Sequence, residues 1–353
     1  MPVSERVGGE RVTPGAMQIR PRDLLLSWGK LLCGKTPLLS IEVTRECPLN
    51  CPGCYAYADG HAGIGKNIRG MTEFHGDELV SRLLALIERH DPIHVSLVGG
   101  EPLLRHRELS RVLPVLSARG RVSLVVTSGV LPIPRDWTRL PRVTVCVSVD
   151  GLPRDHDVRR HPATYDRILR NIDGCRVCLH WTIVRAQIEQ PGYLEEYLSF
   201  WDRRQEVDRI LVSLYSPQRG EKTAEMLPAE ARREVAARLH ILSQTYTKLI
   251  APQCLTDAFI TPPPNAGSCT YALISRNYTP DLATTVEPCV LGGAPDCSQC
   301  GCAVSAALNG VAGLELLGPL KVRQLIRAST SIASLVTHIR RSPDPARIAL
   351  GRS

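Results

Sequence analysis

The sequence has few aromatic residues and no long apolar run. Phe, Trp and Tyr make up 5% of the 353 residues, so the core must consist mainly of Leu, Val, Ile and Ala. No apolar stretch approaches the ~18 residues that a membrane-spanning helix needs, and the opening MPVSERVGGERVTPG has no apolar signal-peptide core. With 43% hydrophobic and 22% charged residues, the composition predicts a globular, cytoplasmic protein.

Basic residues exceed acidic residues only slightly, since 43 basic and 35 acidic residues give a net charge of +8. The surplus is uneven, because residues 321–353 contain seven Lys or Arg and one acid, Asp344. A basic end favours an anionic surface, and a solvated helix face is the simpler interpretation. We expect no nucleic acid partner.

Cysteine, in contrast, is abundant and clustered. Thirteen is an odd number, and without an export signal a disulfide framework is not expected. One group lies at residues 47, 51 and 54, and six more cysteines follow residue 250. Such clusters in a reducing compartment indicate metal binding.

Apolar, β-branched runs alternate with amphipathic patterns through the first two thirds of the chain. The runs predict buried strands at 38–46, 93–99, 121–128, 142–149, 176–184 and 208–214. The patterns between and after them predict helices at 72–90, 104–119, 164–173, 192–204 and 227–250, and only a short helix within 129–141. This alternation is typical of parallel βα units. We therefore expect an α/β fold, a partial (β/α)6 TIM-like barrel, with function at the carboxyl ends of the strands.

The composition of the sequence changes after about residue 250. The following segment is rich in Pro, Gly and Cys and lacks periodicity, which predicts a small Cys-rich, metal-stabilised domain. We divide the chain into an N-terminal extension (1–37), a barrel (38–250), a Cys-rich auxiliary metal domain (251–318), and a basic amphipathic helix and tail (319–353).

Three cysteines follow the first predicted strand directly. Cys47, Cys51 and Cys54 stand at i, i+4 and i+7 in one loop and can converge on one cluster. Three ligands leave one iron of a [4Fe–4S] cluster free for a substrate or cofactor. A structural zinc site is the alternative, but it requires four ligands, and His61 is the only nearby candidate.

The second predicted strand ends in Gly99-Gly100-Glu101-Pro102. Glycines let the backbone approach a ligand closely, and the carboxylate can accept hydrogen bonds from a cationic amine. Alone this motif could be a turn. One βα unit after the cysteine group, it indicates a cofactor site.

In this order, over about residues 38–250, the motifs resemble those of the radical SAM superfamily. The three-Cys loop matches the family's cluster loop, and GGEP matches its motif for the amino group of S-adenosylmethionine. Thr127-Ser128-Gly129 stands where many relatives have Thr-Asn-Gly, and Ser148-Val149-Asp150-Gly151 resembles the fourth-strand region that contacts the ribose and the methionine carboxylate. The resemblance thus implies cofactor contacts at Gly99, Gly100, Glu101, Pro102, Ser128, Ser148, Asp150 and Arg159.

The resemblance also implies a mechanism and a partner. A reduced cluster donates one electron to the sulfonium, which gives methionine and a 5′-deoxyadenosyl radical that modifies the substrate. The protein binds, orients and excludes water. A one-electron reductant such as flavodoxin or ferredoxin is the expected partner.

One position departs from the family pattern. Relatives usually carry an aromatic residue before the third cysteine, near the adenine, whereas this chain has Gly53, with Tyr55 after the cysteine. Some relatives, including the adenosylhopane-forming lipid enzymes, also carry Gly. This similarity is one reason to keep a lipid substrate as an alternative.

The late cysteines resemble a reduced SPASM/twitch extension, which binds auxiliary [4Fe–4S] clusters. A cysteine, a hairpin with a Pro-Asp turn and a Pro-Cys pair occur in the family's order, although Leu282 replaces the usual hairpin glycine. The resemblance implies one auxiliary cluster, held by Cys269, Cys289 and two of the last three, and zinc is the alternative. The candidate ligands are Cys269, Cys289, Cys297, Cys300 and Cys302.

The remaining cysteines have simpler interpretations. Cys33 and Cys146 are expected in the core. Cys175 and Cys178 form a CxxC that runs into a strand, where alternation points them to opposite faces, so we interpret them as structural. Cys254 is either a spare ligand or has no metal role.

Both ends of the chain contain amphipathic segments with basic flanks. In 320–342, Val322, Leu325, Ile326, Ala333 and Val336 share one helical face, opposite Arg323, Arg327, His338 and Arg341. DLLLSWGKLLCGK (23–35) likewise combines apolar bulk with basic residues. Packing on the barrel is the favoured interpretation, and contact with anionic lipid is the alternative.

These observations predict a radical SAM enzyme that modifies a peptide or another polar substrate, either macromolecular or small. A lipid or isoprenoid-like substrate at the membrane surface, with the protein peripheral to it, is the alternative within the family. Outside it, the chain could be a non-enzymatic iron–sulfur or zinc protein, although such a protein has no need of GGEP or SVDG.

Overall fold

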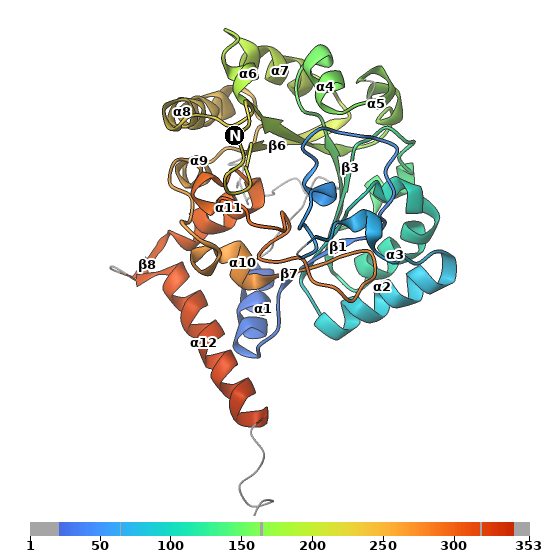
Figure 1. Cartoon of the computed structure of the whole chain (residues 1–353), viewed down its shortest axis with the longest axis vertical. Coiled ribbons are helices and arrows are strands. Elements are labelled where there is room, and N and C mark those ends of the chain that lie inside the picture. Colours follow the sequence, from blue (N-terminus) through green and yellow to red (C-terminus); the bar gives the residue numbers. More distant parts are fainter. Residues whose placement is uncertain (1–20, 64, 163–164, 318–319, 342–353) are drawn as a thin grey trace, which may run out of the picture.

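A computed structural model describes residues 21–63, 65–162, 165–317 and 320–341. Its centre is an open, parallel, seven-stranded sheet with the strand order β6-β5-β4-β3-β2-β1-β7, curved so that helices surround it (Figure 1). The strands are β1 (Leu38–Glu42), β2 (His94–Val98), β3 (Val122–Thr127), β4 (Val143–Ser148), β5 (Val177–Ile183), β6 (Val207–Leu214) and β7 (Ser275–Tyr278). The predicted partial-barrel fold class is confirmed, and each of the six predicted strands is present.

Helices follow the strands in the order that βα units require. They are α1 (Pro21–Leu32), α2 (Gly76–His90), α3 (His106–Ala118), α4 (Pro153–Arg159), α5 (Tyr165–Asn171), α6 (Arg185–Ile188), α7 (Tyr193–Asp202), α8 (Ala229–Thr245), α9 (Gln253–Ile260), α10 (Thr270–Ile274), α11 (Ala303–Ala312) and α12 (Val322–Arg341). As expected, the Pro-rich connection before β4 holds only the short 3₁₀ helix Arg135–Arg139.

The Cys-rich segment is more regular than its composition predicts. It contains α9, α10 and α11, and β7 pairs in parallel with β1, from Leu38↔Ser275 to Ile41↔Tyr278. These elements are too short for a periodic pattern to reveal them. The segment after residue 250 thus adds a strand to the barrel sheet. The division of the chain into domains at residue 250 stays a prediction.

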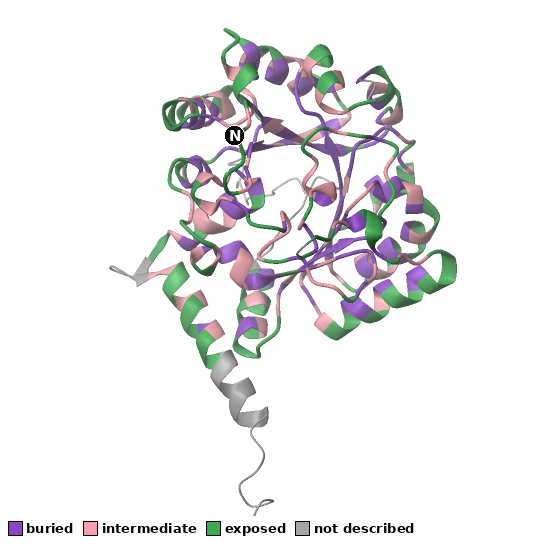
Figure 2. Ribbon diagram, viewed as in Figure 1, coloured by how far each residue is buried: buried purple, intermediate pink, exposed green. Residues whose placement is uncertain are grey.

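The two faces of the sheet differ in character. The face toward the helices is apolar, with Ile41, Leu97, Val125, Val145 and Leu179 buried in one continuous core (Figure 2). The inner face carries a small separate cluster of Leu124, Cys146 and Cys178. Strand alternation places the neighbouring polar residues on this inner face as well, namely Ser40, Glu42, Ser96, Ser148, His180, Thr182 and Ser213.

Helix α1 closes the amino-terminal end of the barrel. Asp23 pairs with Arg142, directly before β4, at 2.9 Å, and both side chains are buried. Lys30 pairs with Asp91, shortly before β2. The cysteine loop and the GGEP turn follow the carboxyl ends of their strands. Helix α1 therefore lies at the opposite end of the barrel from these loops.

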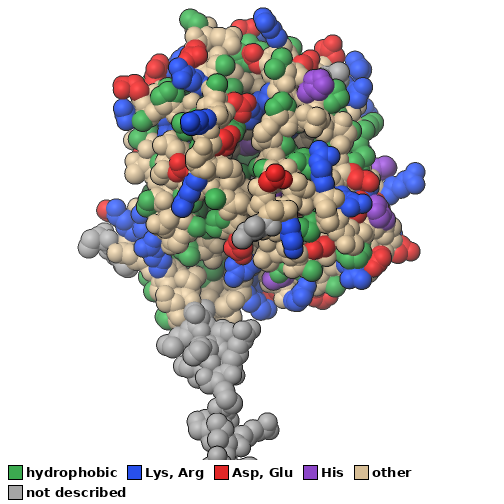
Figure 3. Space-filling view, viewed as in Figure 1, with side chains coloured by type: hydrophobic (Ala, Val, Ile, Leu, Met, Phe, Trp, Pro, Cys, Tyr) green, Lys and Arg blue, Asp and Glu red, His purple; other side chains and the backbone are tan. Residues whose placement is uncertain are grey.

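The C-terminal helix α12 packs against α1. Among the residues that the structure describes, no helix has both the length and the apolarity to cross a membrane. Basic and acidic side chains are interspersed over the face shown in Figure 3. The side chains of Ala333, Val336, His338 and Arg341, and the tail with Asp344, lie outside what the structure describes.

Candidate active site

The first cysteine group lies in the loop that follows β1. Cys47, Cys51 and Cys54 are all half-buried. Burial raises the pKa of Cys47 to about 11, and the charges of Glu101, Cys51 and Cys54 add to this effect. Burial also raises the pKa of Cys51. The three thiols thus lie near one another and near Glu101, at the mouth of the barrel, in an environment that a bound cation would stabilise as thiolates.

The glycine pair after β2 allows two chain segments to touch. Gly99 has φ +79°, and a Cβ there would lie 2.3 Å from Cβ of Glu42. Gly100 has φ +52°, and a Cβ there would lie 2.3 Å from the carbonyl oxygen of Glu46. No other residue fits either position. The GGEP turn is therefore packed directly on the start of the cysteine loop.

Glu101 is buried and accepts four hydrogen bonds, so it joins the ends of β2 and β3. Its Oε1 accepts from the backbone N–H of Leu103 at 3.0 Å and from Thr127 Oγ1 at 2.5 Å. Its Oε2 accepts from the backbone N–H of Ser128 at 2.8 Å and from Ser128 Oγ at 2.5 Å. These bonds occupy all the lone-pair sites of a carboxylate. Predicted contact residues on two strands are thereby brought together, and Pro102, also buried, begins the short helix behind them.

Asp150 is the centre of a buried ionic network after β4. Its Oδ2 accepts from Arg160 Nε at 2.9 Å and from Arg159 Nε at 3.3 Å, and its Oδ1 accepts from the Thr182 N–H at 2.9 Å. Although burial alone would raise it, the pKa of Asp150 is held well below its usual range by the Arg160 and Arg159 guanidiniums. Arg159 also pairs with Glu225.

Arg160 is a site residue that the sequence analysis missed. It is largely buried beside Asp150, and its charge lowers the pKa of Cys51 against the larger effect of burial. A buried guanidinium next to the cysteine loop would offset the negative charge of a thiolate-ligated cluster. In the sequence it is the second of two adjacent arginines, a pattern that also occurs on solvated helices.

His61 does not lie free as a fourth metal ligand. Its Nε2 is 2.7 Å from Glu42 Oε1, and its Nδ1 is 3.1 Å from the carbonyl oxygen of Leu291. Burial raises the pKa of Glu42, and the neighbouring His61 partly offsets that effect. A Cβ on Gly292 would lie 2.5 Å from His61 Nδ1. His61 therefore connects the first cysteine loop, through Glu42, to the loop that contains the late cysteines.

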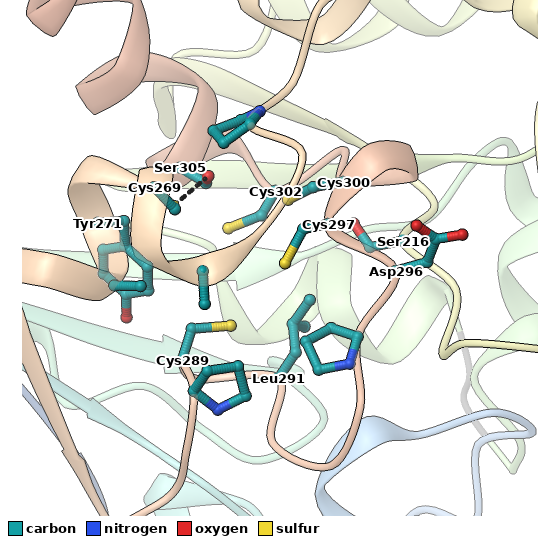
Figure 4. Close-up of a pocket in the computed structure, with 15 residues that line it drawn as sticks. Ser216, Cys269, Tyr271, Cys289, Leu291, Asp296, Cys297, Cys300, Cys302 and Ser305 are labelled. Atoms are coloured by element: carbon teal, nitrogen blue, oxygen red, sulfur yellow. Dashed lines mark hydrogen bonds between the residues drawn. The ribbon is translucent and has the colours of Figure 1, made fainter.

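The late cysteines converge on one pocket. All five candidates line it, together with Ser216, Tyr271 and Ser305. Figure 4 shows the sulfurs of Cys289, Cys297 and Cys302 directed toward its middle. Cys269 Sγ instead lies 3.3 Å from Ser305 Oγ. Burial raises the pKa of Cys289 to about 12 and raises the pKa values of Cys297, Cys300 and Cys302 as well.

A second buried guanidinium lies beside this pocket, behind Cys300. Arg232 of α8 donates to the carbonyl oxygens of Phe259, Gln299 and Cys300 at 3.1, 2.6 and 2.9 Å. Burial lowers the pKa of Arg232, and Cys300 and Asp296 act against this effect. A buried cation whose hydrogen bonds go to carbonyl groups fits a site where thiolates supply the opposite charge.

Two further observations bear on the metal alternatives. Within the described parts of the chain, no three His, Cys, Asp or Glu side chains surround a point where a single metal ion would bind. Thiolates that hold a four-iron cluster each bind a different iron, so their sulfurs need not surround one point. The thiols that this structure offers as donors are three in the cysteine loop and five around the pocket.

The other cysteines have the surroundings expected for structural residues. Cys175 lies in the main core and Cys178 in the inner-face cluster with Cys146, so the CxxC pair is divided between two faces. Cys33 is exposed rather than buried, so the prediction of a core position for it was wrong. Cys254 does not line the pocket of the late cysteines.

The chain is similar to known proteins in sequence and in fold. Residues 41–183 match the family model described as the radical SAM superfamily. A Fe-coproporphyrin III synthase of Methanosarcina barkeri is 27% identical over 164 residues, which are 44% of this chain and 39% of that protein. A 7-carboxy-7-deazaguanine synthase of Hyperthermus butylicus is 31% identical over 121 residues, 34% of this chain and 47% of that one. The matches thus span less than half the length of these curated relatives.

Solved structures share the fold at low sequence identity. The Streptococcus suis protein SuiB, bound to its precursor peptide SuiA, superposes with a TM-score of 0.54 at 14% identity and covers 76% of this chain and 63% of that one. The protein anSMEcpe with bound AdoMet gives 0.52 at 14% identity, over 83% of this chain and 81% of the other. At this identity the likeness concerns the fold.

Proposed function

We propose that this chain, whose residues 41–183 match the radical SAM superfamily, is an enzyme that cleaves S-adenosylmethionine reductively to modify a polar substrate. Cys47, Cys51 and Cys54 hold a [4Fe–4S] cluster in this proposal. The convergence of this loop, GGEP and the Asp150 network at one mouth of the barrel is the observation that carries it. When bound, the cluster and cofactor supply one electron and a 5′-deoxyadenosyl radical.

The chain's own residues position the cofactor in this proposal. Gly99 and Gly100 let the backbone approach it, and Glu101 faces its ammonium group. The carboxylate of Glu101 already accepts four hydrogen bonds, so one donor must turn away. Ser128 Oγ is suited to do so, because a hydroxyl rotates about its C–O bond whereas a backbone N–H is fixed.

The loop after β4 supplies two positive charges and the carboxylate that holds them in place. Arg159 and Arg160, both anchored on Asp150, present guanidinium groups near Cys51. In this proposal Arg159 lies toward the cofactor carboxylate and Ser148 toward its ribose. Asp150 acts by holding both arginines, since its carboxylate is buried and accepts three hydrogen bonds within the protein.

We place an auxiliary cluster in the pocket of the late cysteines. Five thiols line it, and the buried Arg232 supplies compensating charge beside Cys300. Cys289, Cys297 and Cys302 are the ligands whose sulfurs already face its middle. Either Cys269 or Cys300 supplies the fourth thiolate. A one-electron carrier such as flavodoxin or ferredoxin delivers the electrons.

The polarity of the inner sheet face favours a polar substrate, such as a peptide, over a lipid. Hydroxyl, imidazole and carboxylate groups lie toward the mouth of the barrel, for example His180, whose Nε2 is 2.7 Å from Ser213 Oγ. Such groups can also hydrogen-bond to a peptide, whereas an isoprenoid chain offers them no donor or acceptor. SuiB, which shares the fold, binds a peptide.

The test is product formation by reconstituted, reduced protein. Formation of 5′-deoxyadenosine without substrate tests the cleavage step, and its increase with a peptide fraction but not an isoprenoid lipid fraction tests the substrate class. Stimulation by the lipid fraction alone would establish the lipid alternative. Iron-loaded protein that forms no 5′-deoxyadenosine would indicate a non-enzymatic iron–sulfur protein.

A further inference from the structure

Helix α1 presents large apolar side chains to solvent. The exposed fractions are 59% for Leu24, 73% for Leu25, 53% for Leu26, 38% for Trp28 and 44% for Leu32. These are five of the twelve exposed large apolar residues among those that the structure describes. Scattered apolar residues are normal on a surface, but five on a 12-residue helix form a patch that marks an interaction site.

The arrangement on the helix is continuous. At 3.6 residues per turn, Leu24, Trp28, Leu32 and Leu25 lie within an arc of about 100°, without a charged residue between them. The buried residues Leu31 and Asp23 lie about 20° and 100° outside this arc, beyond Leu24, whereas the exposed Leu26 lies on the other side of α1. The arc therefore borders the side of α1 that packs on the barrel and itself faces solvent.

This helix is fixed to the barrel and is remote from the proposed active site. The buried Asp23–Arg142 pair, at 2.9 Å, and the Lys30–Asp91 pair attach it near the amino ends of β4 and β2. The cysteine loop and GGEP follow the opposite, carboxyl ends of β1 and β2. The apolar face thus has no part in the site already described.

Basic groups flank the apolar face. The side chains of Arg22 and Lys35 are 62% and 49% exposed, and they pair with Asp23 at 4.0 Å and with Asp91 at 3.4 Å. Helix α12, which packs on α1, adds the exposed Arg323 and Arg327. The sequences of α1 and α12 contain one acid, Asp23, which is paired with Arg142.

We propose that α1 and the neighbouring turns of α12 bind the surface of a membrane that contains anionic lipid. An apolar helix face with basic flanks and a Trp is the composition of an interfacial helix. At 12 residues, about 18 Å, α1 lies in the plane of the interface and does not span it. The barrel mouth then faces away from the bilayer, so this surface anchors the enzyme and does not deliver a lipid substrate.

The charges around the apolar face of α1 favour an anionic membrane surface over a second copy of the chain as its partner. Two copies that met through α1 would bring the basic groups of both copies, Arg22, Lys35, Arg323 and Arg327, into one interface, where like charges repel. Anionic lipid head groups match these groups, while the acyl region accepts the Leu and Trp side chains. The proposal is independent of the proposed function, because it uses no residue of the site.

The test is sedimentation of the full chain with vesicles. We expect it to bind vesicles of phosphatidylcholine and phosphatidylglycerol at least about tenfold more tightly than vesicles of phosphatidylcholine alone, with weaker binding as salt rises. The double change Leu25→Ser and Trp28→Ser should weaken binding to mixed vesicles about tenfold or more. Ile241→Ser, on α8 and 64% exposed, is the matched control and should bind as the wild type does.

Two further readouts separate this outcome from its rivals. Urea unfolding and basal cofactor cleavage should be the same in the double variant and the wild type. Equal vesicle binding by both proteins, or none by the wild type, would overturn the proposal. A wild-type dimer that dissociates in the double variant, without vesicle binding, would assign the face to a second copy of the chain instead.

Discussion

Replacing Glu101 by Gln should disturb both the fold and the cofactor site, and the two effects can be measured separately. The carboxylate accepts from two backbone N–H groups, those of Leu103 and Ser128, and from two hydroxyls, those of Thr127 and Ser128. Gln replaces one oxygen by an NH₂ group, which donates. Whichever oxygen is replaced, one N–H donor then meets another.

The expected magnitude follows from which partner can adapt. A hydroxyl can turn its lone pair toward the new NH₂, but the backbone N–H of Leu103 or Ser128 cannot. One buried donor is therefore left without an acceptor, which costs about 1–3 kcal/mol. We expect the free energy of unfolding of Glu101→Gln to fall by about that amount.

Urea unfolding, followed by tryptophan fluorescence, provides the assay, with an unchanged m-value as the sign that only stability changed. Glu108→Gln is the control. Glu108 also accepts a backbone N–H, from Gly76 at 2.9 Å, but in an exposed setting, so its replacement should change stability by less than about 0.5 kcal/mol. Equal stability of the two variants would refute the hydrogen-bond argument.

Cofactor affinity is the second readout on the same variant. If Glu101 also holds the cofactor's ammonium group, Glu101→Gln should weaken binding of S-adenosylmethionine by roughly 1.5–3 kcal/mol while the iron content stays the same. Equilibrium dialysis under anaerobic conditions measures this. Reduced stability with unchanged affinity would restrict Glu101 to joining β2 and β3.

The buried charges and the late cysteines give four further predictions. Asp150→Asn removes the carboxylate partner of Arg160 and leaves Arg159 with Glu225 alone, so urea unfolding should show a loss of about 3–5 kcal/mol. A loss below about 1 kcal/mol would contradict the network. The pKa of Asp150 is lowered in the folded state. Its contribution to the free energy of unfolding of the wild type is therefore present above about pH 4 and should be lost as the pH falls further. A contribution that does not change with pH over this range would contradict the shift. Reconstituted wild-type protein should carry about eight irons. The double variant Cys289→Ala, Cys300→Ala should carry about four, retain cofactor cleavage and lose substrate turnover. About four irons plus one zinc in the wild type would make the pocket a zinc site. Arg232→Met should shift the reduction potential of the auxiliary cluster to a more negative value in a spectroscopic titration, since a nearby positive charge is lost, and an unchanged potential would separate Arg232 from the cluster.

The barrel was predictable because strands buried on both sides carry long apolar signals. The run around Val143–Ser148, for example, is buried at every position, and its predicted range exceeds the observed strand by one residue at each end. By contrast, β7 has only four residues, SRNY, of which two are buried. Its place beside β1 depends on tertiary pairing, which no local pattern records.

The candidate site was predictable where a motif fixes the backbone. Gly99 and Gly100 occupy positions that a Cβ would block, so the sequence carries the constraint directly. Arg160, Arg232 and the His61–Glu42 pair act through partners far away in sequence. Their roles follow from burial and charge compensation, which appear only when the chain is folded.

Cofactor cleavage by the reduced protein tests the central proposal most directly. Reconstituted wild-type protein with a strong reductant and S-adenosylmethionine should form 5′-deoxyadenosine and methionine in equal amounts. The variant with Cys47, Cys51 and Cys54 all replaced by Ala should form neither, because each thiolate binds the same cluster. Cleavage that survives the triple replacement would contradict the assignment of this loop, and so would the absence of cleavage by iron-loaded wild-type protein.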